Sequence, residues 1–440
     1  MFAKSIMSFF AVLLFAPAAF AGLNIQSWET SQGARVVFVE NHDLPMLDLS
    51  VDFSAGSARD SREKSGLANL TRHLMTLGAG VYSERDIAEK LADVGAVMSG
   101  RFDADRAGFS LRTLSGKAER EQSVGLLAAI LAQPRFDAGV LEREKARVVV
   151  GLEEAATKPE SIGEKAFQAA IYGDHPYGLS EGGEVASVKL LMPADLATFH
   201  HRYFRAKNMV VALMGDVSRA EAAAIAERLA ADLPAGDAPQ PVAPVQINAQ
   251  GREITIGHHA TQSHLFMGQP GIKREDPEYF SLYVGNYVLG GGGFDSRLMD
   301  AIRQKKGLAY SVYSYFSPMR ELGPFQIGLQ TRRDATQEAV RSARDELVRY
   351  LADGPTEAEL TQAKNNLVGG FPLRIDSNRK ILEYLAVIGF YQLPLDWLDT
   401  YSGKVAAVTR EDILRAFRAR VKPEAMMTVI VGGQSEGLVK

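Results

Sequence analysis

Apolar and polar positions separate at helical spacing between residues 65 and 78. Four leucines fall on one side of such a helix: Leu67, Leu70, Leu74 and Leu77. Three polar residues fall on another side: Asn69, Arg72 and His73. The spacing predicts an amphipathic helix with Ser65 as its N-cap and Gly78 as its stop. One face of this helix should pack in a core, and the other should be free for chemistry.

Two parts of the chain repeat each other at a separation of 217 residues. In each, a helical segment leads into an apolar run that ends at glycine, which is typical of a buried strand. The paired segments are 194–196 leading to 209–215, and 411–413 leading to 426–432, with residues 146–148 and 363–365 matching at the same separation. Strands that alternate with helices in both halves predict an α+β fold of two homologous domains, each a β-sheet covered by helices.

The ends of these domains are marked by composition. Four prolines between Leu233 and Val245 predict an extended linker. At the N-terminus, a positive start at Lys4, an apolar run and the small-residue site Ala19-Phe20-Ala21 predict a signal peptide. The predicted organisation is a signal peptide at 1–21, a first domain at 22–232, a linker at 233–246 and a second domain at 247–440. We therefore expect a periplasmic or secreted protein with no membrane span after signal removal.

Composition excludes several classes of protein. The chain has 440 residues, 46% of them hydrophobic and 23% charged, which suits a globular protein of two domains. Its formal net charge of -4 argues against nucleic acid as a partner. Because there is no cysteine, neither a disulfide nor a lipid-modified cysteine can form.

The polar face of the predicted helix carries the sequence Asn69-Leu-Thr-Arg72-His73, which resembles a degraded His-x-x-Glu-His motif. Together with motifs over nearly the whole mature chain, it resembles the pitrilysin/insulinase family of zinc peptidases, of the short bacterial type. The other segments that carry the resemblance are 44–46, 49–57, 95–96, 105–111 and 175–178. The resemblance implies paired domains that face one another as half of a clamshell.

In active members of that family, two histidines hold zinc and the glutamate takes a proton from the attacking water. Asn69 is a poor ligand, and the fixed positive charge of Arg72 cannot act as a base. A third ligand is implied about 77 residues past His73, where Val150 and Gly151 stand. The nearby Glu153 and Glu154 would point to other faces of a helix. We expect no metal in this chain and zinc in a partner; a rearranged site using His73, Glu153 or Glu154 is an alternative.

The second half contains the segment 296–313, which resembles the family's Arg/Tyr motif and places Arg303 and Tyr310 at the expected separation. The resemblance implies that both side chains bind the substrate backbone beside the zinc, which suits a guanidinium and a phenol. Without the resemblance, the preferred interpretation is a solvated helix residue and a core strand residue. The adjacent glycines 290–293 lack the features of a phosphate-binding loop. The pairs His200-His201 and His258-His259 are predicted to be surface or structural residues.

These observations predict a non-catalytic subunit of a heterodimeric zinc peptidase. Arg303 and Tyr310 would bind the substrate, and a homologous partner would bring the zinc motif. An extended peptide is expected to bind along a sheet edge. Two alternatives remain: a peptide-binding or structural pseudopeptidase that acts without such a partner, and the rearranged metalloenzyme.

Overall fold

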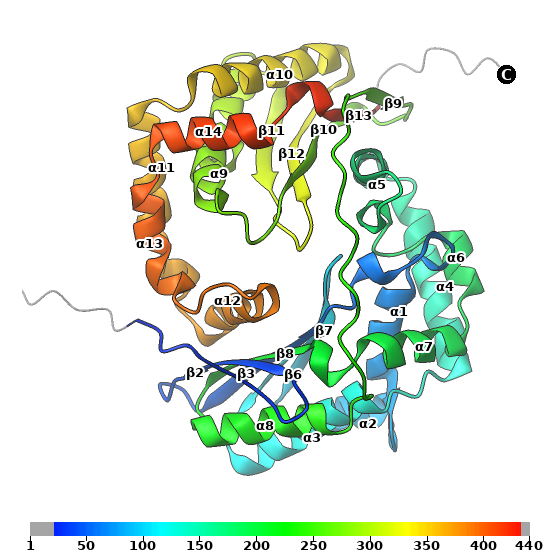
Figure 1. The fold of residues 1–440 in the computed structure, drawn as a ribbon. Coiled ribbons are helices and arrows are strands. Elements are labelled where there is room, and N and C mark those ends of the chain that lie inside the picture. Colours follow the sequence, from blue (N-terminus) through cyan, green and yellow to red (C-terminus); the bar gives the residue numbers. More distant parts are fainter. Residues whose placement is uncertain (1–21, 433–440) are drawn as a thin grey trace, which may run out of the picture.

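The structure, a computed structural model, describes residues 22–432, so the predicted signal peptide lies outside the described residues. Two mixed β-sheets stand apart in the ribbon, and helices cover the outer face of each (Figure 1). The predicted α+β class and the two domains are confirmed. Within residues 22–432, no helix combines the length and the apolar character that crossing a membrane requires.

The first domain contains a sheet in the order β1-β2-β8-β3-β7-β6, antiparallel except where β2 meets β8. Its strands are β1 (Gln26–Glu29), β2 (Arg35–Glu40), β3 (Met46–Phe53), β6 (Val97–Phe102), β7 (Ala107–Leu114) and β8 (Met209–Gly215), beside a hairpin of β4 (Gly78–Ala79) and β5 (Tyr82–Ser83). Its helices are α1 (Leu67–Leu74), α2 (Glu84–Asp93), α3 (Lys117–Ala132), α4 (Ala138–Ala155), α5 (Pro159–Tyr172), α6 (Val185–Leu190), α7 (Pro193–Tyr203) and α8 (Arg219–Ala231).

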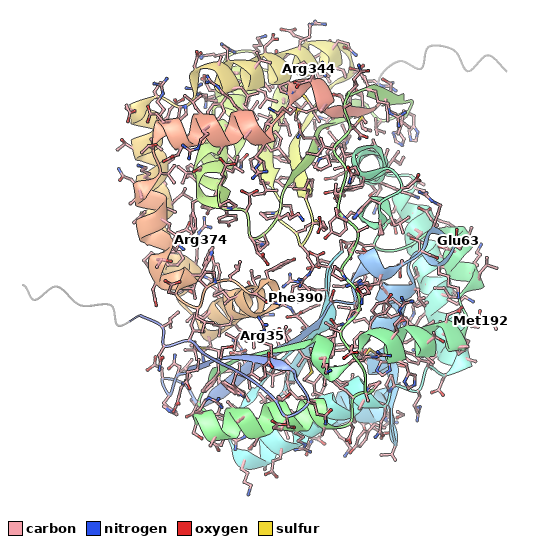
Figure 2. The ribbon with its side chains drawn as sticks, in the orientation of Figure 1. Arg35, Glu63, Met192, Arg344, Arg374 and Phe390 are labelled. Atoms are coloured by element: carbon pink, nitrogen blue, oxygen red, sulfur yellow. The ribbon has the colours of Figure 1, made fainter. Side chains whose placement is uncertain are left out.

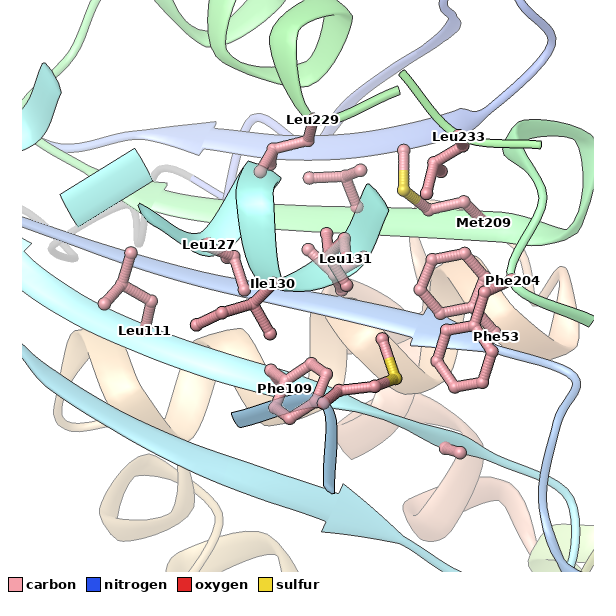
Figure 3. Packing of buried hydrophobic residues seen from close by; sticks show 14 of the residues in the cluster. Phe53, Phe109, Leu111, Leu127, Ile130, Leu131, Phe204, Met209, Leu229 and Leu233 are labelled. Carbon is pink, nitrogen blue, oxygen red and sulfur yellow. The ribbon is translucent and has the colours of Figure 1, made fainter. Parts of the chain in front are cut away.

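Apolar side chains join this sheet to its helices. Leu127, Ile130 and Leu131 of α3 meet Phe109 and Leu111 of β7 in a continuous buried cluster (Figure 3). At the other end of the cluster, the rings of Phe53 and Phe204 lie 4.8 Å apart. Burial of such side chains is the main force that holds the helices on the sheet.

The second domain contains a sheet in the order β11-β12-β10-β13-β9, antiparallel except where β13 meets β9. Its strands are β9 (Glu253–Ile256), β10 (Gln262–Ile272), β11 (Ala309–Phe316), β12 (Gly323–Arg332) and β13 (Met427–Val431). Its helices are α9 (Tyr279–Asn286), α10 (Thr336–Asp353), α11 (Glu357–Gly369), α12 (Asn378–Tyr391), α13 (Trp397–Ala407) and α14 (Arg410–Arg420).

The two sheets confirm the predicted internal repeat. Strands β2, β8, β3, β7 and β6 of the first domain have the same order and relative directions as β9, β13, β10, β12 and β11 of the second. Helix α7 leads into β8 as α14 leads into β13. As a consequence, β6 and β11 occupy equivalent positions, each at the edge of its sheet.

One helix of each domain packs on the β-sheet of the other domain. Helix α5 packs on β10 and β13 of the second sheet, and α12 packs on β8, β3 and β2 of the first. A glycine lies at the closest approach on each helix. A Cβ on Gly163 of α5 would come within 2.3 Å of Phe266, and a Cβ on Gly389 of α12 within 2.7 Å of Val210. This exchange makes the two domains one interlocked unit.

The segment between α8 and β9 contains no helix or strand and follows the surface between the domains (Figure 1). Hydrogen bonds with side chains of the first domain hold it in place. Arg59 donates from Nη1 to the carbonyl of Gln240 at 2.6 Å, and His175 donates from Nε2 to the carbonyl of Ala243 at 2.7 Å. The proline-rich stretch is therefore attached to the first domain over part of its length.

Asp105 joins the domains at a buried point and is only 4% exposed. Its carboxylate accepts hydrogen bonds from the hydroxyl of Tyr177 in the first domain and from the hydroxyl of Tyr391 on α12 at 2.8 Å. It also accepts from the backbone N–H of Arg320, between β11 and β12, at 2.7 Å. The Arg320 guanidinium lies 4.6 Å from the ring centroid of Phe390, which is labelled in Figure 2.

Helix α1 begins differently from the prediction. Its N-cap is Gly66, with a φ of 94°, and not Ser65. The carboxylate of the buried Asp60 accepts the backbone N–H of Gly66 at 2.8 Å and of Ala68 at 2.9 Å. Ser65 was the wrong choice because a carboxylate from outside the helix satisfies these groups. Burial raises the pKa of Asp60 to about 7, although both hydrogen bonds act in the other direction.

Candidate functional site

The polar residues of α1 lie together on the face that turns away from the core. Arg72 donates from Nη2 to Oδ1 of Asn69 at 3.1 Å, and Asn69 Nδ2 donates to the carbonyl of Glu181 at 3.4 Å. Leu70 and Leu74, on the opposite face, are buried in the first domain's core. The predicted division of this helix into an apolar and a polar face is therefore present.

His73 contacts a carboxylate that the sequence reasoning missed. Its Nε2 lies 3.1 Å from Oε2 of Glu144 on α4, whose side chain is 4% exposed. Arg143 and Arg147 donate to the other oxygen at 2.7 and 3.0 Å. Burial raises the pKa of Glu144, but hydrogen bonds from Arg143 and His73 outweigh it and hold this pKa below its ordinary value. The carboxylate is thus already neutralised by its neighbours.

The sequence held one signal for the position of Glu144 but none for its contact with His73. Glu144 precedes Gly151, one of the two positions where the third zinc ligand is implied, by seven residues. Seven residues make about two helical turns, so both positions lie on one face of α4.

The remaining positions do not complete a metal site. The side chain of Val150 is apolar and 64% exposed. Glu154 pairs with Lys158 at 2.7 Å. Between residues 22 and 432, no three histidine, aspartate or glutamate side chains come together in a way that could hold a metal ion. The arrangement around His73 favours hydrogen bonding and ion pairing over metal coordination.

The Arg72 guanidinium rests against strand β6. A Cβ on Gly100 would lie 1.8 Å from Nη1 of Arg72, so this side chain fills the space that any larger residue would need. Nε of Arg72 is buried and has no hydrogen-bond partner among the described residues. Burial lowers the pKa of Arg72.

Arg303 and Tyr310 come together in the second domain. The Cζ atom of Arg303 lies 4.7 Å from the ring centroid of Tyr310 and 4.8 Å from that of Phe294. Tyr310 is 80% exposed and Phe294 is 63% exposed. Tyr310 is therefore not a core residue. The guanidinium lies between two exposed aromatic rings, which is a favourable cation–π arrangement.

The backbone around Arg303 is irregular. Arg303 belongs to a π-helical segment, Met299–Gln304, and a second such segment, Tyr287–Gly291, leads into the glycine run that ends at Phe294. Gly307, with a φ of 62°, then turns the chain into β11. Short π-helical segments occur frequently at functional sites. Phe294 was missed by the sequence reasoning, which weighed the glycines and not the aromatic residue after them.

A cavity of about 940 Å³ lies between the domains, beside α4 and α5 and the end of β11. Residues from both domains line it, among them Leu152, Tyr172, Glu181, Tyr315 and Pro324. Reduced hydration, and then the charges of Asp103 and Glu164, raise the pKa of Glu181 to about 7. The cavity mixes apolar and acidic groups, and it reaches Glu181, whose backbone holds Asn69.

The two histidine pairs have structural or surface positions. His200 is 3% exposed and donates from Nε2 to the carbonyl of Leu131 at 2.7 Å. Burial lowers the pKa of His200 to about 4. His258 lies 3.1 Å from the carbonyl of Thr157.

Comparison with known proteins agrees with this fold. Residues 35–183 match the model of the insulinase family (peptidase family M16), and residues 191–367 match that of the peptidase M16 inactive domain. The crystal structure of a peptidase M16 inactive domain from Pseudomonas fluorescens is 36% identical, with a TM-score of 0.90 over 94% of this chain and 98% of that one. The chain belongs to the M16 peptidase family.

Two further relatives are more distant. A non-peptidase homologue from Helicobacter pylori is 24% identical over 406 residues, 91% of this chain and 92% of that protein. An uncharacterised zinc protease from Streptomyces coelicolor is 25% identical over 389 residues, 85% of this chain and 82% of that protein.

Proposed function

We propose that this chain is the non-catalytic subunit of a heterodimeric zinc metallopeptidase. The observation that carries the proposal is a contrast between the two domains. Asn69, Arg72 and the captured Glu144 offer neither a ligand set nor a base. Arg303 and Tyr310, in contrast, lie side by side, with the tyrosine exposed and the arginine half-buried.

In this proposal, Arg303 and Tyr310 bind the carbonyl groups of a peptide whose scissile bond lies in the partner's zinc site. The guanidinium carries a permanent positive charge, and the phenol donates one hydrogen bond. Both can stabilise negative charge that develops on a carbonyl oxygen during hydrolysis. Because the Arg303 side chain is already held between two rings, it loses little conformational entropy when a peptide binds.

The partner is a homologous subunit that carries His-x-x-Glu-His and the zinc. The complex would act in the periplasm or outside the cell, because residues 1–21 have the features of a signal peptide. N-terminal sequencing of the native protein should give Gly22 as the first residue. Retention of residues 1–21 would contradict the proposed location.

Kinetics of a reconstituted complex test the proposed roles. The chain is co-expressed with a zinc-motif homologue, and the complex is isolated by size-exclusion chromatography and assayed with an internally quenched peptide. Arg303→Ala or Tyr310→Phe should lower kcat/KM by about 10- to 1,000-fold, as expected when an oxyanion donor is lost. Arg332→Ala, at an exposed arginine of the same domain, serves as the control and should change little. Unchanged kinetics for both variants in an intact complex would overturn the proposal.

A second candidate is a pseudopeptidase that binds peptides or has a structural role without a hydrolytic partner. The resemblance to a non-peptidase homologue and to an M16 inactive domain favours it. Affinity purification of the native chain discriminates the two candidates. Recovery of a zinc-motif homologue supports the heterodimer, and recovery of the chain alone supports the second candidate.

A further inference from the structure

Among the described residues, Arg72 is a cation without an anionic partner. Its guanidinium makes one hydrogen bond, to the neutral amide of Asn69, and no ion pair joins it to a carboxylate among the described residues. The arginines around it are different, because Arg101 pairs with Asp52, and both Arg143 and Arg147 pair with Glu144. A partly buried charge without a counter-ion is costly, so an anion that reached Arg72 would be bound favourably.

The position of the guanidinium is fixed by strand β6. Met98 and Phe102 of this strand pack against the core, and Gly100 lies between them on the same face. The missing side chain of Gly100 leaves the space that Nη1 of Arg72 occupies. Arg72 is thereby held at the edge of the first sheet.

That edge can take another strand. Strand β6 pairs with β7 along one side, and no described strand pairs with its other side. Gly100 and Ser99 are exposed there. A strand edge with unpaired N–H and C=O groups is a template for an extended peptide. A peptide bound along β6 would pass next to the Arg72 guanidinium.

We propose that Arg72, held by Asn69 over Gly100, binds a carboxylate of a peptide that adds to the free edge of β6. A guanidinium is the side chain best suited to this group, because its planar N–H donors match the two oxygens of a carboxylate. The carboxylate comes either from the peptide's C-terminus or from an aspartate or glutamate side chain. The inference rests on the peptide-binding part of the proposed function, but it needs neither zinc nor a partner.

Calorimetric titration of the purified chain tests the inference. Three acetylated octapeptides of alternating Thr and Ser are compared at low salt. One ends in a free carboxylate, one ends in an amide, and one ends in an amide but carries a central Glu. At least one of the two peptides with a carboxylate should bind about tenfold more tightly than the neutral one. Which of the two does so identifies the source of the carboxylate.

Variants of the chain show whether Arg72 is responsible. Arg72→Gln should remove the preference for the carboxylate and leave binding of the neutral peptide unchanged. Gly100→Ala should weaken the preference as well, because it keeps the charge of Arg72 but places a methyl group where the guanidinium lies. Arg85→Gln, at an exposed arginine on α2, serves as the matched control. Circular dichroism verifies that each variant is folded.

Three results would overturn the inference: equal affinity of the wild-type chain for all three peptides, absence of measurable binding, or a preference that survives in Arg72→Gln. None of them bears on Arg303 and Tyr310, whose roles are tested by the kinetics of the complex. Failure of this inference and failure of the proposed function can therefore be told apart.

Discussion

The carboxylate of Asp105 should be a main determinant of the stability of the domain interface. Asp105→Ala removes the acceptor for the hydroxyls of Tyr177 and Tyr391 and for the backbone N–H of Arg320. Both tyrosines are 4% exposed, so water cannot easily replace the lost partner. A buried polar group left without a partner costs about 1–3 kcal/mol, so three such groups should lower the free energy of unfolding by about 3–9 kcal/mol.

A double-mutant cycle isolates the contribution of one of these contacts. Tyr391→Phe removes only a hydroxyl and should cost about 1.5–3 kcal/mol in the wild-type chain, because the acceptor is charged. In the Asp105→Ala background the same change should cost nothing or restore some stability, because it removes a hydroxyl that has already lost its partner. Urea unfolding, followed by circular dichroism and tryptophan fluorescence, gives the four free energies. Asp232→Asn, at an exposed position after α8, serves as the control. Equal costs of Tyr391→Phe in the two backgrounds would refute the assigned role of Asp105.

Three further predictions concern metal, pH and the aromatic residue beside Arg303. Elemental analysis should find much less than one zinc ion per chain in both the wild type and the Asn69→His/Arg72→Glu variant, since no third carboxylate is free to bind the metal. One zinc ion per chain in either protein would contradict this prediction. Burial lowers the pKa of His200 to about 4, so the folded chain holds this imidazole neutral at a pH where the unfolded chain protonates it. The stabilisation is therefore complete above pH 6.5 and is lost as pH falls towards 4. Urea unfolding at several pH values should show a loss of about 3 kcal/mol that is smaller in His200→Gln; identical pH profiles would speak against it. Phe294→Ala should lower kcat/KM of the complex about two- to fivefold while Phe294→Tyr keeps it, and equal rates for all three proteins would assign Phe294 no role.

Periodicity and repetition were enough to predict the architecture. The helix of residues 65–78 was predicted from leucine spacing; α1 covers Leu67–Leu74, where all three leucines are buried, and Leu77 follows in a 3-10 turn and is partly buried. The repeat was visible because a helix followed by a buried strand and a glycine leaves the same local pattern in both halves. Local patterns of this kind depend on residues that are neighbours in sequence, which is why one sequence reveals them.

Contacts between distant segments were not predictable in the same way. The cap of α1 comes from Asp60, outside the helix, and the partner of His73 comes from another helix, 71 residues later. Likewise, nothing in the pattern of α5 or α12 says that each covers the sheet of the other domain. These arrangements depend on tertiary packing, which single-sequence periodicity does not contain.

The structure also explains how the chain can lack a zinc site and keep its fold. Helix α1 is held by its buried leucines and by the cap from Asp60, all of them on sides that face the protein. Asn69, Arg72 and His73 lie on the opposite side, where they contribute little to the core. In the second domain, Tyr310 is exposed on β11, the edge strand that the repeat makes equivalent to β6, and the half-buried Arg303 packs against its ring. Because the residues that build the scaffold differ from those at both edges, the chemistry at one edge can change while the other edge and the fold stay intact.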